Sequence, residues 1–350
     1  MKVILKILKY FLLIILGIVV IVFGIRFYNQ KQTEKLAKLD PNYKLERFYS
    51  EEDLKDASKL NIPGVKVSDV NGDSLKGYHL VPDEIKHSGV VLTYGGSEGS
   101  TNFNYAADIA QKGYEVFAMY YFNAEGLPEE LINVPLENFE KVSSEIEKTA
   151  KSPRPLTILG GSKGADYALL LSTKYADKID NIILYAPSAY VFQGLSFKDR
   201  TAHSSWTLGG SELEFLNFYN IDGKLGMKIF TDMLLGKPMH YYPTYKALID
   251  DKNHSEGARI KVENSKANAL VFAGGQDQMW PSAEMAETIE KNYGGQIEVK
   301  IFEKAGHIFY GPPVVQNLMM GGEYAANVEA KAESDRILFE KLAEWMPESN

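Results

Sequence analysis

One segment near the middle of the chain constrains the fold more than any other: TILGGSKGADYALLL, from Thr157 to Leu171. Its β-branched and apolar start indicates a strand, its glycines indicate a tight turn, and the apolar residues that follow indicate a helix. The sequence therefore predicts a strand that turns directly into a helix, with Ser162 in the turn. Two interpretations compete for such a turn: a nucleophilic serine and a loop that cradles phosphate.

The phosphate interpretation requires spacings that this turn lacks. A Walker A loop needs G-x-x-x-x-G-K-[ST], and a dinucleotide fingerprint needs G-x-G-x-x-G after the first strand of a βαβ unit. The turn reads Gly160-Gly161-Ser162-Lys163-Gly164, and several predicted strands precede it. The nucleophile interpretation fits better, because G-x-S-x-G strains its serine and needs small residues two positions away on each side. Gly160 and Gly164 occupy those positions, so Ser162 is the predicted nucleophile.

Predicted strands and helices alternate through most of the chain. Apolar runs such as SGVVLTYGG and KANALVFAGG alternate with helical patterns such as PLENFEKVSSEIEKTA. This alternation predicts an α/β fold with a mostly parallel sheet and helices on both faces. A hairpin is predicted around Asn71-Gly72. Residues from about 190 to 265 fit the alternation poorly and are rich in aromatic residues, which predicts a lid-like insertion above the sheet.

The order of candidate residues along the chain tests the nucleophile interpretation independently. Where a serine lies on a strand-turn-helix of this kind, the acid follows the serine and the histidine follows the acid. Asp277 directly follows the predicted strand ALVFAGG, and ligand sites lie at such strand ends in open α/β sheets. His307 is the only histidine after Asp277. We therefore predict a catalytic triad in which His307 takes the proton of Ser162 and Asp277 orients the imidazole.

An oxyanion hole for this chemistry needs two backbone amides. One should belong to the residue after the nucleophile, Lys163, and the other to the loop TYGGSEGS, at Gly96 or Ser97. The Lys163 side chain is not needed for the reaction, and we expect it to be solvated or to attract an anionic group. Trp206 and Trp280 are candidates for lining an acyl pocket, and burial in the core is the alternative for such aromatic side chains.

The N-terminus carries a long apolar stretch, KVILKILKYFLLIILGIVVIVFGIRF. Its uncharged part, Tyr10 to Ile25, is slightly shorter than the roughly 20 residues that span a bilayer, but lysines before it can snorkel. A cleaved signal peptide is the alternative, with only a poor cleavage site, so we favour a transmembrane anchor over 1–28. Residues 29–60 then form a stalk and 61–348 a catalytic domain. A basic head before a first apolar segment usually stays in the cytoplasm, which favours an extracytoplasmic domain.

Composition narrows the class of partner. The net charge of -8 argues against nucleic acid, whose binding rests on clustered Lys and Arg. With 0 cysteines there are no disulfides, thiolate metal sites or cysteine nucleophiles, and the 6 histidines lack HExxH spacing. We therefore expect no metal and no cofactor. The expected partners are a small acyl ester or thioester substrate and the membrane that the N-terminal helix crosses.

Several blocks of the chain resemble a known family. GGSKGADYALLLS, SSWTLGG, ARIKVENSKANALVFAGGQDQMWPS and KAGHIFYGPP are similar, in this order, to the acyl-CoA thioester hydrolases and the related bile acid-CoA:amino acid N-acyltransferases. The resemblance covers about Gly89 to Pro313. It implies an α/β-hydrolase fold with Ser162, Asp277 and His307 as its triad, and a serine hydrolase that cleaves acyl thioesters or esters.

Two departures from the family bear on the expected function. Family members of the eukaryotic type carry a β-sandwich domain where this chain has an apolar segment, a short stalk and a hairpin, so the substrate need not contain CoA. The conjugating branch uses a cysteine nucleophile, whereas the serine here favours hydrolysis over transfer to an amino acid. A carboxylesterase, a peptidase or amidase on the same fold, and a membrane-anchored binding module are the alternatives.

Overall fold

The computed structural model of the chain describes residues 2–39, 49–50, 52–56, 60–196, 198–307, 309 and 311–348. Eight strands form one sheet in the order β1-β2-β4-β3-β6-β7-β10-β11. Their bounds are β1 Val65–Gly72, β2 Leu75–Pro82, β3 Val90–Tyr94, β4 Glu115–Met119, β6 Leu156–Gly161, β7 Asn181–Tyr185, β10 Asn268–Gly274 and β11 Ile297–Phe302. The pairs β1/β2 and β2/β4 are antiparallel, and the other pairs are parallel. This is the α/β-hydrolase fold class, as predicted.

The central strands are buried along their whole length, because helices cover both faces of the sheet. Every residue of β3, β4 and β7 is buried, which explains why these strands read as continuous apolar runs without alternation. Two separate clusters of buried apolar side chains lie between sheet and helices, one on each face. The predicted parallel sheet between two helical layers is therefore confirmed.

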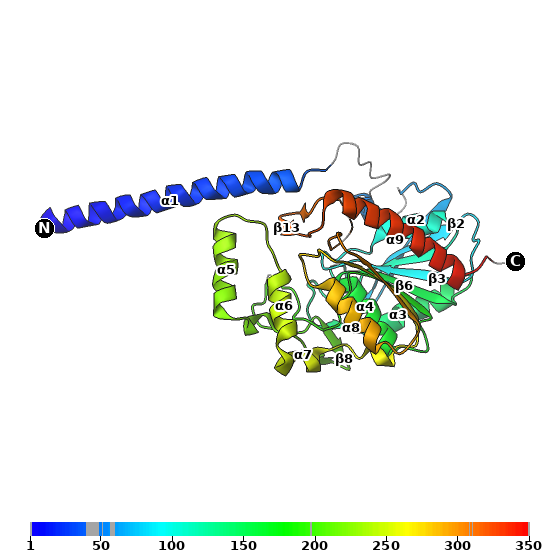
Figure 1. Ribbon diagram of the computed structural model, residues 1–350. Helices are drawn as coiled ribbons and strands as arrows, with labels where there is room; N and C mark the ends of the chain where they lie inside the picture. The colour runs from blue at the N-terminus through cyan, green and yellow to red at the C-terminus, as the bar shows by residue number, and fades with distance from the viewer. Residues whose placement is uncertain are drawn as a thin grey trace.

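The helices divide between the two faces as Figure 1 shows. Helices α2 (Phe103–Gln111) and α9 (Tyr324–Trp345) contribute to one apolar cluster through side chains such as Ile109 and Leu338. Helices α3 (Asn138–Thr149), α4 (Lys163–Lys174) and α8 (Ser282–Asn292) contribute to the other. Helix α9 has no counterpart among the elements predicted from the sequence.

The predicted hairpin forms, but its turn lies two residues later than expected. The register pairs Gly72 with Leu75, so the loop consists of Asp73 and Ser74. Ser74 adopts a left-handed conformation with φ 54. Asn71 and Gly72, which suggested the turn, are the last residues of β1.

The segment between β7 and β10, where the sequence predicts an insertion, carries several short elements. They are β8 Trp206–Leu208, β9 Ser211–Glu212, η3 Phe218–Asn220, α5 Gly223–Leu234, α6 Tyr242–Asp250, α7 Lys252–Ala258 and η4 Val262–Asn264. Strands β8 and β9 join β5 (Val134–Pro135) in a small sheet of their own. In Figure 1, α5 stands at the end of the body that faces α1.

Helix α1 (Lys2–Leu36) projects from the body (Figure 1). It continues past residue 28, so its last turns belong to the predicted stalk. Residues 40–48, 51 and 57–59 of that stalk lie outside the described residues, and Asp53–Lys55 form the short helix η1. The segment Val3–Leu36 is long and apolar enough to cross a membrane, and its most apolar window is 0% buried. A signal sequence passes the same test of length and composition, but such exposure is not that of a core helix.

Candidate active site

The turn between β6 and α4 holds Ser162 in a strained conformation. Its backbone has φ 51 and ψ -120, outside the regions that residues with a side chain normally occupy. The Ser162 amide donates a hydrogen bond of 2.8 Å to the carbonyl of Tyr185, at the end of the neighbouring strand β7. The chain passes from strand to helix at this single residue, which leaves the hydroxyl at the helix N-terminus.

The glycines around Ser162 are required by close contact of backbone with backbone. A Cβ added at Gly160 would lie 2.2 Å from the carbonyl oxygen of Gly164, and one added at Gly164 would lie 2.1 Å from that of Gly95. An added Cβ at Gly161 meets nothing within 4 Å among the described residues. The tight strand-to-helix turn thus explains why small residues stand two positions before and after the serine.

Ser162, His307 and Asp277, which are distant in sequence, meet at one edge of the sheet. His307 Nε2 lies 2.9 Å from Ser162 Oγ, and His307 Nδ1 lies 2.7 Å from Asp277 Oδ2. The other Asp277 oxygen, Oδ1, accepts hydrogen bonds from the amides of Met279 (2.8 Å) and Trp280 (3.2 Å). Both His307 and Asp277 are 2% exposed, so water competes little for these contacts. The arrangement can pass a proton from the hydroxyl to the imidazole.

A residue that the sequence analysis missed holds the loop that carries His307. Asn327, in the first turn of α9, is 2% exposed and accepts a hydrogen bond of 2.8 Å from the Gly306 amide. Its Nδ2 donates to the carbonyls of Gly311 (2.8 Å) and Gly321 (3.2 Å). Asn327 thus joins backbone groups on both sides of His307. An asparagine in an unpredicted helix gave no signal in the sequence.

The predicted oxyanion loop lies beside Ser162. A Cβ added at Gly96 would be 3.4 Å from Ser162 Cβ. However, the Gly96 amide donates a hydrogen bond of 2.9 Å to Glu98 Oε1, so this donor is occupied by a side chain of its own loop. Ser97 is exposed. Lys163 begins α4, which places its amide next to the serine.

Tyr121 holds this loop through its side chain. Its hydroxyl donates hydrogen bonds to the carbonyl oxygens of Gly95 (3.2 Å) and Gly96 (2.9 Å). Burial raises the pKa of Tyr121 well above its usual value, so the hydroxyl stays a donor. Trp206, a predicted pocket residue, packs against Tyr121 and Tyr167 with ring centroids 5.6 and 5.1 Å apart and is 0% exposed. The tryptophan therefore contributes to the packing that supports the loop.

Trp280, the other predicted pocket residue, contacts the triad directly. Its ring meets the His307 ring edge to face at 5.3 Å, and its backbone amide binds Asp277. Tyr245 and Phe192 of the predicted insertion pack against the other parts of the indole, at 5.4 and 6.4 Å. Trp280 thus lies between the imidazole and the insertion.

The expectation of a solvated Lys163 side chain is wrong. The side chain is 1% exposed, and its Nζ lies 3.2 Å from Asp166 Oδ2 and 5.4 Å from the centre of the Phe192 ring. The 3.2 Å contact is close enough for an ion pair but is not aligned as a hydrogen bond. Burial lowers the pKa of Lys163 and raises that of Asp166 to about 6, although the ammonium opposes the second shift. Asp166 Oδ1 also accepts a hydrogen bond from the Ser188 amide.

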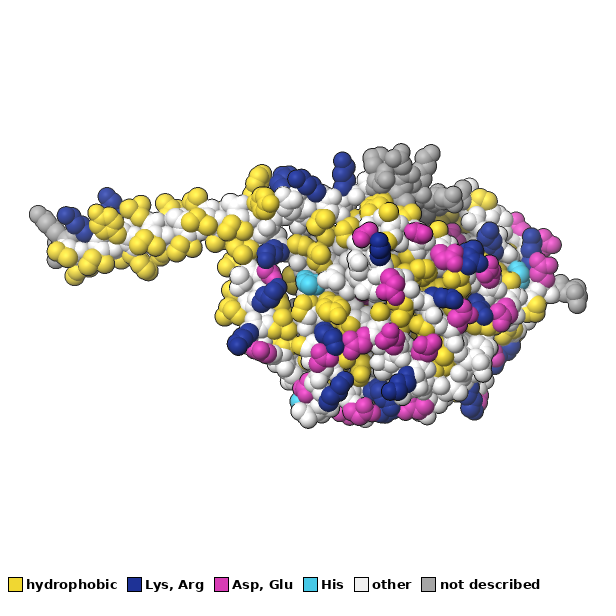
Figure 2. All heavy atoms as spheres, in the orientation of Figure 1, with side chains coloured by type: hydrophobic (Ala, Val, Ile, Leu, Met, Phe, Trp, Pro, Cys, Tyr) yellow, Lys and Arg dark blue, Asp and Glu magenta, His cyan; other side chains and the backbone are white. Residues whose placement is uncertain are grey.

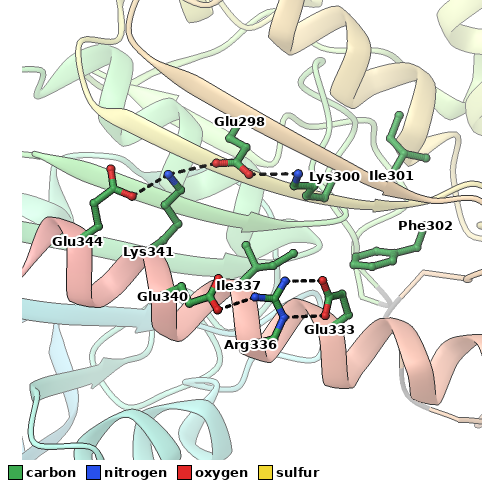
Figure 3. A pocket seen from close by; sticks show the side chains of 10 residues that line it. All are labelled: Glu298, Lys300, Ile301, Phe302, Glu333, Arg336, Ile337, Glu340, Lys341 and Glu344. Atoms are coloured by element: carbon green, nitrogen blue, oxygen red, sulfur yellow. Dashed lines mark hydrogen bonds and ion pairs between the residues drawn. The ribbon is translucent and has the colours of Figure 1, made fainter.

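A groove of about 460 Å³ lies between β11 and α9 (Figure 3), and Ser162, Asp277 and His307 are not among its lining residues. Its charged side chains are paired with one another: Arg336 with Glu333 and Glu340, and Lys341 with Glu298 and Glu344. Groups that already satisfy each other offer little to a charged ligand. Among the described residues, no group of three or more His, Cys, Asp or Glu side chains is placed to hold a metal ion.

Comparisons with solved structures find an esterase and a hydrolase at low similarity. An esterase from Pyrococcus furiosus is 13% identical and aligns over 88% of this chain and 99% of that chain, with a TM-score of 0.48. A dienelactone hydrolase from Anabaena variabilis is 14% identical, over 79% of this chain and 97% of that chain, with a TM-score of 0.42.

Comparisons of sequence find thioesterases and an acyltransferase. Acyl-coenzyme A thioesterase 6 of Homo sapiens is 25% identical over 289 residues, which are 78% of this chain and 63% of that protein. Acyl-coenzyme A thioesterase 1 of Mus musculus is 24% identical, over 75% of this chain and 61% of that protein. Acyl-coenzyme A amino acid N-acyltransferase 2 of Rattus norvegicus is 27% identical over 39% of this chain and 33% of that protein. The chain spans about three fifths of the length of the two thioesterases.

The resemblance inferred from the sequence blocks is confirmed by a family model that covers the serine turn, the predicted insertion and the histidine loop. The model, described as BAAT / Acyl-CoA thioester hydrolase C terminal, matches residues 134–332, more than half of the chain. The protein therefore belongs to the BAAT / acyl-CoA thioester hydrolase C-terminal family.

Proposed function

We propose that this protein is a serine hydrolase that cleaves acyl esters or thioesters, with Ser162 as nucleophile, His307 as general base and Asp277 as the group that orients the imidazole. One observation carries the proposal: the His307 ring forms hydrogen-bond contacts with both partners, between Nε2 and Ser162 Oγ (2.9 Å) and between Nδ1 and Asp277 Oδ2 (2.7 Å). The strained backbone of Ser162 adds support, because such strain persists where function needs it.

In the proposed reaction, Ser162 Oγ bonds to the acyl carbon while its proton moves to His307 Nε2. The negative charge then lies on the former carbonyl oxygen, next to the amide of Lys163 and the loop at Gly96 and Ser97. The imidazolium protonates the leaving alcohol or thiol as the bond to the acyl carbon breaks. Water attacks the acyl-enzyme with His307 again as base, which releases the acid and regenerates the serine.

Acyl-coenzyme A is the proposed thioester, because the relatives that match most of this chain are named acyl-coenzyme A thioesterases. The proposed organisation is an anchor at 1–28, a stalk at 29–60 and a catalytic domain at 61–348 with an insertion at about 190–265. An extracytoplasmic domain would have no access to acyl-coenzyme A. Cleavage of the domain by protease added to intact cells would support the extracytoplasmic position and favour other esters, whereas protection would favour the CoA thioester.

The nucleophile is tested with a fluorophosphonate probe on the full-length protein. We expect the unmodified protein and Ser144→Ala to be labelled, and Ser162→Ala to remain unlabelled. Ser144 is a matched control because it is an exposed serine on α3. Labelling that persists in Ser162→Ala would refute the assignment. An unlabelled but folded parent protein would favour a binding module instead of an enzyme.

The substrate class is tested by turnover of palmitoyl-CoA, p-nitrophenyl esters and peptide amides under identical conditions. We expect turnover of thioester or ester, since these bonds release a better leaving group than an amide does. Faster turnover of the peptide amide would support the peptidase alternative and refute the proposed bond specificity, while the nucleophile assignment would stand.

A further inference from the structure

Helix α5 presents a stripe of apolar side chains to the outside of the protein. Met227, Phe230, Met233 and Leu234 are 64%, 55%, 51% and 45% exposed. Because they recur every three or four residues, they lie on one face of the helix. All of α5 is described, and none of its residues is buried. Figure 2 shows hydrophobic side chains gathered at this end of the body, where α1 approaches. Such a patch marks a surface that binds another apolar surface.

Helix α1 contacts the C-terminal end of α5 at one position along its length, at Arg26 and Asn29. The Arg26 guanidinium donates hydrogen bonds to the carbonyls of Met233 (3.2 Å) and Leu234 (2.7 Å). Asn29 Nδ2 donates to the carbonyl of Leu235 at 2.8 Å. These carbonyls lie at the C-terminal end of α5, where a cation is favoured by the helix dipole. The two helices therefore meet at Arg26.

Arg26 is also the first charged residue after the apolar run of α1. The uncharged run before it rises about 24 Å at 1.5 Å per residue, and snorkelling lysines extend it toward the ~30 Å of a hydrocarbon core. Phe27 and Tyr28 follow and are 65% and 62% exposed. Aromatic and basic residues are typical of the level where a span leaves the membrane. For a membrane that α1 crosses, its surface thus lies at Arg26 and at the end of α5.

The direction of α5 suits that surface. In Figure 1, α5 runs across the direction of α1 and not along it. A helix that lies across a span extends along the plane of the bilayer. Lysines accompany the apolar stripe at 224, 228 and 237, and Asp232 pairs with Lys228 and Lys237 at 2.6 and 2.7 Å. An apolar face beside basic residues is the pattern of helices that lie in the headgroup layer.

We propose that α5 is a second membrane contact, an interfacial helix whose apolar stripe enters the surface of the bilayer that α1 crosses. The stripe contacts a phospholipid bilayer and not a protein, because the contact of Arg26 with α5 puts the stripe at the boundary of the apolar span. The proposal rests on α1 acting as an anchor and not on the hydrolase activity. A second copy of the chain is the competing occupant.

The test uses single-cysteine variants of the full-length protein, whose sequence has 0 cysteines and so allows unique labelling. Phe230→Cys carries an environment-sensitive fluorophore in vesicles of phosphatidylcholine and phosphatidylglycerol that contain nitroxide-labelled lipid. Val20→Cys, at a position 63% exposed in α1, is the reference inside the membrane. Glu287→Cys, at an exposed position on α8, is the aqueous reference. We expect lipid quenching at 20 and 230 but not at 287, and a blue shift of the emission at 230.

Each other outcome counts against the proposal. A label at 230 that behaves like the label at 287, while 20 is quenched, would overturn the contact and leave the anchor standing. The absence of quenching at both 20 and 230 would overturn both. Adding Met227→Asp and Leu234→Asp should reduce quenching at 230 and leave 20 unchanged. Unchanged quenching at 230 would mean that the contact with α1 alone keeps α5 near lipid, without insertion of the apolar stripe. Crosslinking of two copies through 230 without lipid quenching would assign the stripe to a second copy.

Discussion

Asn327→Ala should have two separate effects: it should lower the stability of the fold, and it should displace the His307 imidazole. The side chain is 2% exposed and makes three hydrogen bonds, with the Gly306 amide and with the carbonyls of Gly311 and Gly321. Removing it leaves three backbone groups without this partner, at a cost of about 1 kcal/mol each. We therefore expect the free energy of unfolding to fall by about 3 kcal/mol, which lowers the Tm of a domain of this size by roughly 6 °C.

We expect Asn327→Ala to lower kcat more than its loss of stability alone would. Gly306 immediately precedes His307, so a loop released by Asn327→Ala shifts the imidazole relative to Ser162. A misplacement of about 1 Å costs on the order of 100-fold in rate. We expect kcat for an activated ester to fall roughly 10- to 100-fold at a temperature where the variant is fully folded, with little change in KM.

Ser334→Ala is the matched control for this prediction. Ser334 is a buried residue of α9 whose hydroxyl donates within the helix, to the Lys331 carbonyl at 3.0 Å. Its removal should cost about 1 kcal/mol of stability and leave kcat unchanged. If Asn327→Ala lowers the Tm but keeps the kcat of the parent protein, Asn327 only stabilises the fold and the reasoning about His307 is refuted.

Three further predictions concern the surroundings of Ser162, the proposed nucleophile. Glu98→Ala should raise kcat/KM for esters, because it frees the Gly96 amide that Glu98 now occupies, and a fall would exclude this amide as an oxyanion donor. Gly160→Ala should cost about 3 kcal/mol in denaturant unfolding while Gly161→Ala is tolerated, since only the first Cβ meets backbone, at 2.2 Å. Lys163→Met should cost about 3 kcal/mol by leaving Asp166 uncompensated, and adding Asp166→Leu should recover part of this loss. Because burial already raises the pKa of Asp166 to about 6, the carboxyl in Lys163→Met should bind a proton more readily in the folded state than in the unfolded state. The single variant should therefore be more stable at pH 5 than at pH 8, and thermal melts that show the reverse would contradict this account.

The turn at Ser162 could be predicted because most of its determinants are local. The strand, the strained serine and both glycines lie within a few residues of one another, and a Cβ at Gly160 would meet the Gly164 carbonyl oxygen of the same turn. Gly164 itself is needed because its backbone touches Gly95, the residue after β3. The acid and the histidine were predicted from chain order and from their position after strands. That reasoning needs the topology of the sheet but no detail of side-chain packing.

The failures of prediction also have physical causes. Helix α9 buries Asn327, Ala330 and Ser334 along its first half, so its inner face is small and polar and lacks the apolar periodicity that indicates a helix. A buried Lys163 side chain was not among the expectations, which were solvation or attraction of an anionic group, because lysines are rarely buried without a partner. Its partner Asp166 stands three residues later on the same helix, and that spacing was the available signal.

Ser162 and His307 differ in how far along the chain the groups that hold them lie. The turn at Ser162 has its glycines within two residues, although the Ser162 amide also donates to the Tyr185 carbonyl on β7. His307 is held by groups that all come from elsewhere in the chain. The His307 amide donates to the Met320 carbonyl at 2.8 Å, just after the hairpin formed by β12 (Val314–Val315) and β13 (Leu318–Met319). That hairpin in turn exchanges backbone hydrogen bonds with Met239, in the segment that follows α5. The imidazole therefore depends on the hairpin and on α9 together, and no short sequence motif can record such a dependence.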